Sequence, residues 1–412
     1  MSNKLFRFIA VFIVVVMPGY LWAYSDLPTS GTLPDVVHLR KDCANTNPDL
    51  KNCADNMSEM LNWVWSTKAP SVAAPVLINV GPGTFVEFNC NSSGNVTLRG
   101  SGRDNTKIIS SGIKPSFIDS GSGDAAVNAK NCSNLVIEDL TIEGGRYGIR
   151  WMEGGNSVYS NVLVTGNSNA WWDFSFNLGA SKPQSTHYWF SSVLRNAGGA
   201  PEGSNIATLF TYSADHWLYG CEISAISDSQ TGSIVQRAIW VRNEVSAEVR
   251  LFGSVVRVGA SPGTSVGSMG PGGPKLIGVR NDNVFHMHGG IISVDATNAS
   301  NSSVSVKAIS SQNGFSTHTP GVSFIVNPKG SGIASRISGE GIESPYQWPR
   351  GTNPPEIKST LGSDLFVEID CTSNGDCDSG TGTEPHLMIY SENCTATLPW
   401  FDSTRGKCRG EL

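Results

Sequence analysis

The feature of this sequence that most restricts its fold is an internal repeat. Six short apolar segments align on a small or polar residue, with mostly apolar residues three positions before it and two positions after it. Successive aligned residues are 22, 31, 29, 33 and 36 positions apart, which is the length of one strand-and-turn coil with loops of variable size. Since one coil cannot bury its apolar faces alone, the repeat predicts a stacked solenoid. The aligned residues are Asp139, Asn161, Ser192, Cys221, Ser254 and Gly290.

Short β-type runs separated by glycine, asparagine and serine continue through the middle of the chain, and no long amphipathic helix interrupts them. This pattern excludes alternating β-α units. A β-sandwich or an antiparallel barrel is the alternative, and it needs tight turns every ~8–12 residues. Asn-Gly occurs only at residues 313–314 and 374–375, and Asp-Gly does not occur. We therefore predict an all-β chain folded as a single-stranded right-handed parallel β-helix with an N-terminal capping helix and a Cys-rich C-terminal segment.

The sequence divides into four segments. Residues 1–23 read as a signal peptide, and residues 24–73 as an extended segment followed by the capping helix. Residues 74–344 carry the β-helix, and residues 345–412 form a proline-containing linker and the Cys-rich capping segment. The helix is expected at 48–66, because Asn47-Pro48 is typical of a helix start and apolar residues then recur at helical spacing. These apolar residues are Leu50, Cys53, Met57, Leu61 and Val64.

The N-terminus has the pattern of an export signal. Lys4 and Arg7 accompany an apolar run that ends at Met17, and Ala23 offers a small residue for cleavage. The run is shorter than the roughly 20 residues of a comfortable membrane span. We expect a secreted or periplasmic protein with no membrane contact after cleavage, and an uncleaved anchor is the alternative.

All nine cysteines follow this signal, and export permits disulfides. Proximity in sequence favours Cys43–Cys53, Cys371–Cys377 and Cys394–Cys408, although spacing alone does not fix connectivity. The odd number leaves at least one thiol unpaired within the chain. The net charge is −6 and no run of five basic residues occurs, which argues against a nucleic-acid partner.

Residues 76–109 read VLINVGPGTFVEFNCNSSGNVTLRGSGRDNTKII. This segment resembles the opening of the pectin-lyase-like superfamily, most closely that of pectinesterases, in its Pro-Gly-Thr-Phe turn at 82–85 and its G-x-G-x-x-x-T-x-I stretch at 100–108. The resemblance implies a β-helix and a polysaccharide partner. Residues 173–177, DFSFN, are similar to the pectinesterase strand D-F-x-F-G that carries the nucleophile, with Asn177 in place of glycine. The other pectinesterase motifs are missing, as are those of polygalacturonases and the acidic calcium site of pectate lyases.

Asp173 is the first catalytic candidate, because a carboxylate beside aromatic residues can have a raised pKa. Glu153 can supply the second carboxylate that a glycosidase needs. Arg195 and Arg150 can bind uronate carboxylates. For Asp173 the alternative is a loop aspartate that accepts hydrogen bonds from backbone amides, and for the arginines it is ordinary solvated charge. His286 and His288 share one strand face, but no third metal ligand is evident, so we expect no metal and no cofactor.

An aromatic column accompanies the repeat, two residues before the aligned small residue, and a second partial column lies two residues further back. If it points outward it offers a platform for sugar rings, and the alternative is an aromatic stack inside the core. The substrate-binding candidates in these columns are Tyr159, Tyr188, Trp217 and Tyr219.

Three functions remain open from sequence. The first is a polysaccharide lyase, hydrolase or carbohydrate esterase, and the second is a non-catalytic carbohydrate- or surface-binding protein. The third is an adhesin-type solenoid with a protein partner. We expect a monomer, and whether the chain is an enzyme is left open.

Overall fold

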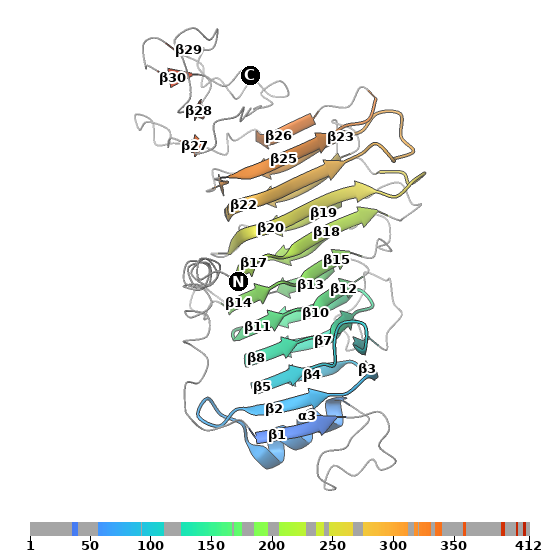
Figure 1. Ribbon diagram of the computed structural model, residues 1–412, viewed down its shortest axis with the longest axis vertical. Coiled ribbons are helices and arrows are strands. Elements are labelled where there is room, and N and C mark those ends of the chain that lie inside the picture. Colours follow the sequence, from blue (N-terminus) through green and yellow to red (C-terminus); the bar gives the residue numbers. More distant parts are fainter. Residues whose placement is uncertain are drawn as a thin grey trace, which may run out of the picture.

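The computed structural model describes residues 35–39, 57–91, 93–110, 125–166, 169–174, 185–196, 206–227, 236–242, 247–266, 275–311, 317–319, 321–330 and 334–339, together with the short strands β27 (Ile357–Ser359), β28 (Ile389–Ser391), β29 (Phe401–Asp402) and β30 (Lys407–Cys408). From residue 76 to residue 339 the chain winds through three parallel strand ladders (Figure 1).

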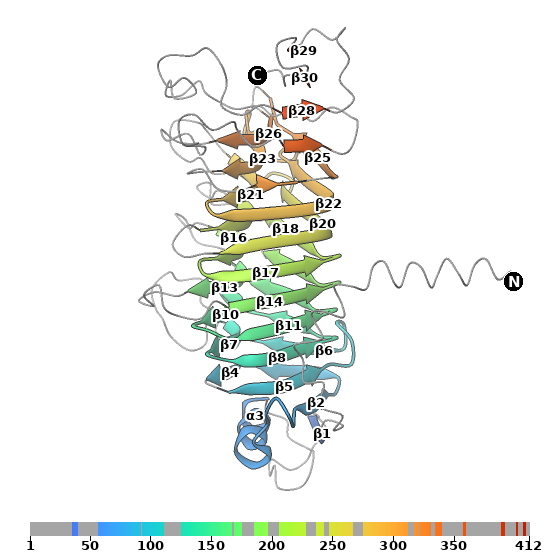
Figure 2. The same cartoon turned by 90° about the vertical axis from the view of Figure 1, so that its left-hand side faces the viewer.

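The first ladder runs along the whole stack (Figure 2). Every pairing within it is parallel and links one coil to the next. Its strands are β1 (Asp35–Leu39), β2 (Val76–Val80), β5 (Gly94–Arg99), β8 (Ser133–Glu138), β11 (Asn156–Ser160), β14 (Ser185–Phe190), β17 (Ala214–Tyr219), the first halves of β20 (Glu248–Ala260) and β22 (Val284–Asp295), and β24 (Thr317–His318).

The second ladder follows the first after a sharp bend, and two of its members are the second halves of β20 and β22. The other members are β3 (Gly83–Val86), β6 (Thr106–Ile109), β9 (Thr141–Glu143), β12 (Leu163–Gly166), β15 (Val193–Asn196), β18 (Glu222–Ser227) and β25 (Val322–Asn327). The third ladder is a separate nine-stranded sheet. It contains β4 (Phe88–Asn91), β7 (Ala125–Lys130), β10 (Tyr147–Met152), β13 (Asn169–Phe174), β16 (Ile206–Thr211), β19 (Gln236–Val241), β21 (Lys275–Asn281), β23 (Ser305–Ser311) and β26 (Ala334–Gly339). The predicted all-β parallel solenoid is therefore confirmed.

A residue with positive φ makes the bend between the first two ladders in six successive coils. Short polar side chains and glycine tolerate this left-handed conformation best, which explains the small residues of the repeat. The bend residues are Asp139, Asn161, Ser191, Gly220, Gly253 and Gly289. The predicted alignment was wrong by one position in its first two coils, because Asp139 and Asn161 correspond to Ser191 and Gly220. Each later bend has two adjacent small residues, so the sequence permits either register.

The core is filled by inward columns of apolar side chains. One column in the first ladder consists of Ile137, Tyr159, Trp189, Leu218, Leu251 and Met287, all fully buried. The residue after the bend is buried where it is Ser192, Cys221 or Ser254, and the two serine hydroxyls bond to backbone amides. Ser192 Oγ accepts from Val162 N at 3.1 Å, and Ser254 Oγ accepts from Cys221 N at 3.1 Å. These hydroxyls satisfy buried amides of the preceding coil.

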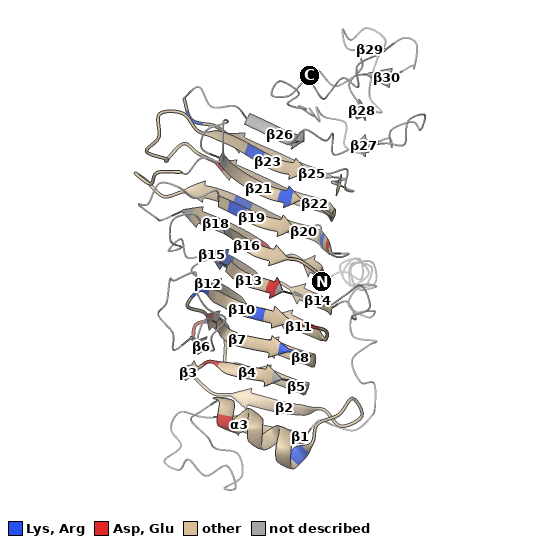
Figure 3. Cartoon of the chain, turned by 180° about the vertical axis from the view of Figure 1, so that it is seen from behind, with Lys and Arg blue, Asp and Glu red and all other residues tan. Residues whose placement is uncertain are grey.

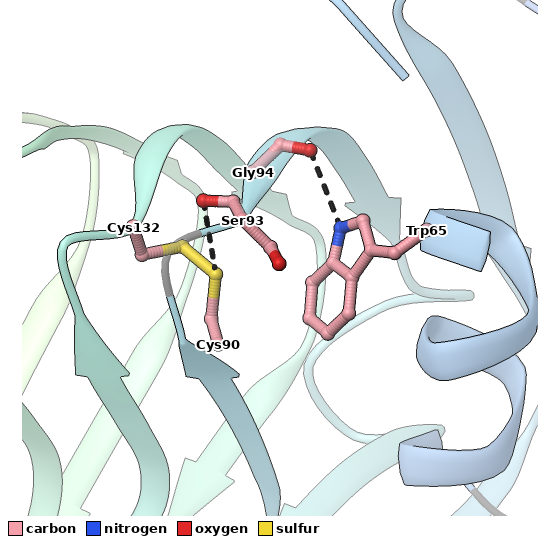
Figure 4. The surroundings of a disulfide bond; sticks show 5 residues. All are labelled: Trp65, Cys90, Ser93, Gly94 and Cys132. Atoms are coloured by element: carbon pink, nitrogen blue, oxygen red, sulfur yellow. Dashed lines mark hydrogen bonds between the residues drawn. A yellow bond between two sulfur atoms is a disulfide. The ribbon is translucent and has the colours of Figure 1, made fainter. Parts of the chain in front are cut away.

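The described part of the predicted helix is α3 (Met57–Trp63), which continues into the π-helical turn η1 (Val64–Lys68). Residues 48–56 lie outside the described residues. Met57, Met60 and Leu61 are buried in the main core. The helix is tied to the first coils by Ser58 Oγ, which donates to Glu87 O at 3.0 Å, and by the Trp65 indole, which donates to Gly94 O at 3.3 Å (Figure 4).

A disulfide joins Cys90, in β4, to Cys132, in the turn after β7, with the Cα atoms 5.6 Å apart (Figure 4). It links the first two coils, and sequence spacing did not predict it because 42 residues separate the partners. Among the cysteines whose side chains the structure describes, Cys221 is free and buried. The predicted pairs Cys43–Cys53 and Cys371–Cys377 lie outside the described residues, as does Cys394.

Candidate functional site

The outer surface of the third ladder carries a row of arginines and aromatic rings. Parallel pairing places Arg150 beside Trp172, Trp172 beside Phe210, Phe210 beside Trp240, and Trp240 beside Arg280. Neighbouring side chains on the same side of the ladder extend this row, and among them Arg237 is fully buried. We call the whole set the arginine face, and it consists of Arg146, Tyr147, Arg150, Trp172, Phe210, Tyr212, Arg237, Trp240, Arg242 and Arg280.

Trp240 is the centre of the arginine face. Three guanidinium carbons lie over its ring, at 4.5 Å for Arg237, 4.7 Å for Arg280 and 5.2 Å for Arg242. Its indole nitrogen donates to Asp282 Oδ2 at 2.8 Å, and Arg280 Nε contacts the same oxygen at 3.1 Å. Each cation–π contact contributes about 0.5–2 kcal/mol depending on its desolvation. The contacts therefore hold three positive charges in fixed positions around one ring.

The same arrangement recurs two coils earlier, around Trp172. The Tyr147 ring stacks on it at 4.9 Å between ring centroids, and the Arg150 guanidinium lies 5.5 Å from its ring centroid. Arg146 in turn lies 4.9 Å from the Tyr147 ring. Basic residues recur along this side of the molecule from β10 to β23 (Figure 3). In a chain of net charge −6, such a concentration makes a local site for anions.

Asp173 also lies on the third ladder, but its side chain faces the opposite way and is only 2% exposed. It accepts hydrogen bonds from Tyr212 N at 2.6 Å, Thr211 Oγ1 at 2.9 Å and Ser213 N at 3.4 Å. Burial raises the pKa of this carboxyl to about 7, although the three hydrogen bonds lower it. The carboxyl therefore holds the turn after β16 in the next coil.

The three predicted catalytic residues do not converge. Glu153 follows β10 and pairs with Lys130 Nζ of the preceding coil at 3.2 Å. Arg195 lies on β15 in the second ladder, with an exposed side chain 3.7 Å from Glu222. Asp173 points into the core, Glu153 pairs with Lys130, and Arg195 lies on the second ladder beside Glu222, so the three side chains have different surroundings. Arg150 does lie on an outward surface, in the arginine face.

The predicted aromatic column is outward for three of its four candidates. Tyr188, Trp217 and Tyr219 are half-buried on the outer surface of the first ladder. Tyr159 is fully buried and stacks on Trp189 at 4.0 Å between centroids, so its outward placement was wrong. The cause is the same one-position shift in register that affected the bend column.

The outward rings stand face to face along the stack. Centroids are 5.3 Å apart for Phe190 and Tyr219, 4.8 Å for Tyr219 and Phe252, and 5.2 Å for Phe252 and His288, with interplanar angles of 7–12°. Stacked rings present their edges to solvent, whereas a sugar stacks on a ring face. This column therefore stabilises the contact between coils and is a poor platform for sugar rings.

The two histidines considered for a metal have other contacts. His286 Nδ1 lies 3.6 Å from Glu248 Oε1, and His288 stacks on Phe252. Among the described residues, no group of three histidine, cysteine, aspartate or glutamate side chains is placed to bind a metal ion.

Sequence reasoning missed the arginine face because loops of different length separate the second and third ladders. A local signal does exist in the third-ladder strands, where a small residue and an apolar residue precede each outward aromatic or arginine. The tripeptides are Gly148-Ile149-Arg150, Ala170-Trp171-Trp172, Thr208-Leu209-Phe210, Ala238-Ile239-Trp240 and Gly278-Val279-Arg280. The small residues point inward, since a Cβ on Gly278 would lie 2.8 Å from Ile292 Cγ2.

The sequence matches no protein-family model and no curated protein. Among solved structures, the chain is similar to a pectate lyase, with 11% identity over 76% of this chain and 80% of that one and a TM-score of 0.46. It is also similar to pectin methylesterase from carrot, with 13% identity, 76% and 86% coverage and a TM-score of 0.38. A third is a bacteriophage tailspike from Acinetobacter baumannii phage Fri1, described as a capsular polysaccharide depolymerase, with 8% identity, 75% and 59% coverage and a TM-score of 0.33. At these identities the likeness concerns the fold alone, and the strand register described above establishes the parallel β-helix independently.

Proposed function

We propose that this chain is an exported β-helix protein that binds an acidic polysaccharide along the arginine face. The observation that carries the proposal is two groups of guanidinium groups held against aromatic rings along one side of a net-acidic chain. Guanidinium groups bind carboxylate and sulfate oxygens through paired hydrogen bonds. Successive coils lie about 4.8 Å apart. The arginines of the face stand in two groups along the stack, one at β10 and one at β19 and β21, so the face can meet an anionic polymer at two places.

Fixed arginines favour binding for a second reason. A free arginine loses side-chain entropy when it is immobilised by a ligand, at about 0.5–1.5 kcal/mol for each side chain. The guanidiniums of Arg242 and Arg280, which are partly exposed, already lie over Trp240. Part of that entropy cost has therefore been met during folding, which supports a preformed binding surface.

We infer binding rather than catalysis as the main activity. A lyase, hydrolase or carbohydrate esterase needs a reactive carboxylate that can reach the polymer. Asp173, the residue most similar to a family nucleophile, is buried and bonded to the turn after β16. In this proposal Tyr188, Trp217 and Tyr219 stabilise the contacts between coils. Arg150 contacts the ligand.

Export is part of the proposal. It rests on the signal-like residues 1–23, which lie outside the described residues, and the Cys90–Cys132 disulfide supports it because such bonds persist in oxidising compartments. In the described part of the chain no helix is long and apolar enough to cross a membrane. We also infer that α3 and η1 cap the N-terminal end of the solenoid, whose open core needs covering, and that the mature chain is a monomer.

The test is binding of the purified mature protein to a polyuronate, a sulfated glycan and a neutral glucan. An Arg150→Gln/Arg242→Gln double variant should bind the anionic glycans at least about tenfold more weakly, since one charge-assisted hydrogen bond contributes about 1.5–3 kcal/mol. An Arg195→Gln/Arg257→Gln variant has the same charge change on exposed residues of the second ladder and should bind like the unmodified chain. Equal losses in the two double variants would contradict the proposed face.

The same samples decide between binding and turnover. Reducing ends, unsaturated products and released methanol are measured after long incubation with each glycan. Binding without product supports the proposal, whereas product formation would show that the chain is an enzyme. Absence of binding to every glycan would favour the adhesin-type alternative, with a protein partner.

A further inference from the structure

A turn between the second and third ladders displays a potential attachment site for a carbohydrate. The motif Asn-x-Ser/Thr occurs at seven asparagines in the sequence, a frequency that chance alone can produce, so structure must separate usable sites from the rest. They are Asn56, Asn91, Asn95, Asn131, Asn298, Asn301 and Asn393. The structure describes the side chains of Asn95, Asn131, Asn298 and Asn301.

We propose that Asn298 carries an N-linked glycan in the exported protein, an inference that rests on the proposed export. Asn298 and Ser300, the two residues that define the motif, are both exposed, while Ala299 between them is 1% exposed and belongs to the core. The buried alanine anchors the turn, and its two neighbours point to solvent.

Backbone contacts on both sides hold this turn. Gly263 N donates to Asn298 O at 3.1 Å, and Ser300 N donates to Thr264 O at 2.8 Å. From the next coil the Lys329 ammonium donates to Ala299 O. Within the described residues no hydrogen bond engages the Asn298 side-chain amide. A glycan on its nitrogen therefore disturbs no contact of the folded chain.

The other described motifs do not combine an exposed asparagine with a side-chain amide that makes no hydrogen bond. Asn95 is half-buried and its Nδ2 donates to Pro70 O at 3.4 Å, while its Oδ1 accepts from Asn134 at 2.9 Å. Asn131 Nδ2 donates to Glu153 Oε2. In both residues the nitrogen that would carry the sugar already donates within the fold.

Asn301 is the fourth case. It is half-buried, and its Oδ1 accepts from Val266 N at 2.7 Å, which fixes the amide against the loop of the preceding coil. Asn298 is thus the described asparagine whose modification the fold accommodates most readily.

The co-reactant of the proposed glycosylation is a lipid diphosphate-linked oligosaccharide. The Asn298 amide nitrogen attacks the anomeric carbon of its first sugar, the C–N bond forms, and the bond from that carbon to the diphosphate oxygen breaks. The lipid diphosphate leaves with the electron pair, and the amide loses one proton. No oxidation or reduction takes place.

The experiment expresses the full chain in a eukaryotic secreting cell, once with its own residues 1–23 and once with a heterologous leader. Protein from the medium is digested, and glycopeptides are mapped before and after treatment with a peptide-N-glycosidase. The expected result is a glycan on Asn298, seen as conversion of that residue to aspartate on enzymatic release. Ser300→Ala should abolish the modification at Asn298, and Ser300→Thr should retain it.

The two leaders allow the proposed export and the proposed glycosylation of Asn298 to be tested separately. Retention of the chain in the cell with its own leader would contradict export, whereas the heterologous arm still reports on Asn298. A secreted chain with unmodified Asn298 in that arm would overturn the inference, including the case in which Asn95 or Asn131 is modified instead. The same glycan on Ser300→Ala would overturn it as well, since the attachment would then not depend on the motif.

Discussion

At the scale of single residues, the core of this solenoid contains polar aromatic side chains that are kept uncharged. His187 and His216 occupy successive coils with ring centroids 5.1 Å apart and are both fully buried. Ser157 Oγ lies 2.7 Å from His187 Nδ1, and the Trp189 indole donates to His216 Nδ1 at 3.3 Å. Trp171 packs against both imidazoles at 4.5 and 5.0 Å. Such a core tolerates histidine only in its neutral form.

Acid should therefore destabilise the fold through these histidines. Burial lowers the pKa of His216 from 6.5 to about 3 and also lowers that of His187. Below pH 6.5 the unfolded chain binds protons that the folded chain does not, so stability is full above pH 6.5 and falls as the pH drops towards 3. His216→Gln should make this fall shallower in urea titrations at several pH values.

A matched control is available on the surface. His288→Gln changes an exposed imidazole and should leave the slope between pH 6.5 and 3 as it is in the unmodified chain. An unchanged slope in His216→Gln would show that His216 does not carry this part of the acid sensitivity.

At the scale of the element, the sharp bends determine how the first two ladders join. Gly290 follows a bend residue and has a φ of +99°, and a Cβ there would lie 2.1 Å from Ser254 O of the preceding coil. Gly220 is itself a bend residue with a φ of +59°, and a Cβ there would meet nothing within 4 Å. The two positions therefore require glycine for different reasons. Gly290 allows a close approach of the backbone, and Gly220 adopts a left-handed conformation.

These two positions give a paired prediction. Gly220→Ala should lower the free energy of unfolding by about 1–2 kcal/mol, the cost of a left-handed L-residue. Gly290→Ala must also displace the backbone of the preceding coil and should cost on the order of 3 kcal/mol or more. Chemical denaturation of the two variants measures the difference, and equal losses would argue against the close contact with Ser254.

The Cys90–Cys132 disulfide is the second feature that stabilises contacts between coils, and its loss should weaken the first two coils. A Cys90→Ala/Cys132→Ala variant is expected to unfold with a free energy about 2–4 kcal/mol lower under oxidising conditions, because the unfolded chain gains freedom. Cys221→Ala, which removes a buried free thiol, should cost only about 1 kcal/mol from lost apolar packing. A loss no larger than that of Cys221→Ala would mean that the crosslink adds little stability.

At the scale of the whole molecule, charge is distributed unevenly over a chain of net charge −6. The third ladder concentrates arginines, while exposed or half-buried acids lie elsewhere, such as Glu222 on the second ladder and Glu248 on the first. In the proposed function, an anionic polymer that lies along the stack meets the arginine face. The elongated shape allows that contact to extend over several coils (Figure 2).

Binding of a polyuronate should consequently depend strongly on salt. Screening acts over about 10 Å at 0.1 M salt and about 3 Å at 1 M, so the dissociation constant should rise steadily across this range. Affinity electrophoresis or calorimetry at increasing salt measures the slope. Binding that does not change with salt would indicate contacts other than the arginines.

The sequence by itself determined the coil repeat and the parallel stacking, because these depend on periodic apolar residues and on short side chains near each bend. It left the register uncertain by one residue wherever two small residues adjoin, and that shift decided whether Tyr159 was inside or outside. It also identified Asp173 by its motif but could not show its orientation.

Only the tertiary structure decided where the candidate site lies. Arg150, Trp172, Trp240 and Arg280 are brought together by strand pairing across loops of unequal length, so no fixed spacing in the sequence connects them. The disulfide between Cys90 and Cys132 is a further case, because its partners are neighbours through coil stacking and not through sequence. A local repeat predicts what each coil looks like, whereas contacts between coils depend on the register that the whole stack adopts.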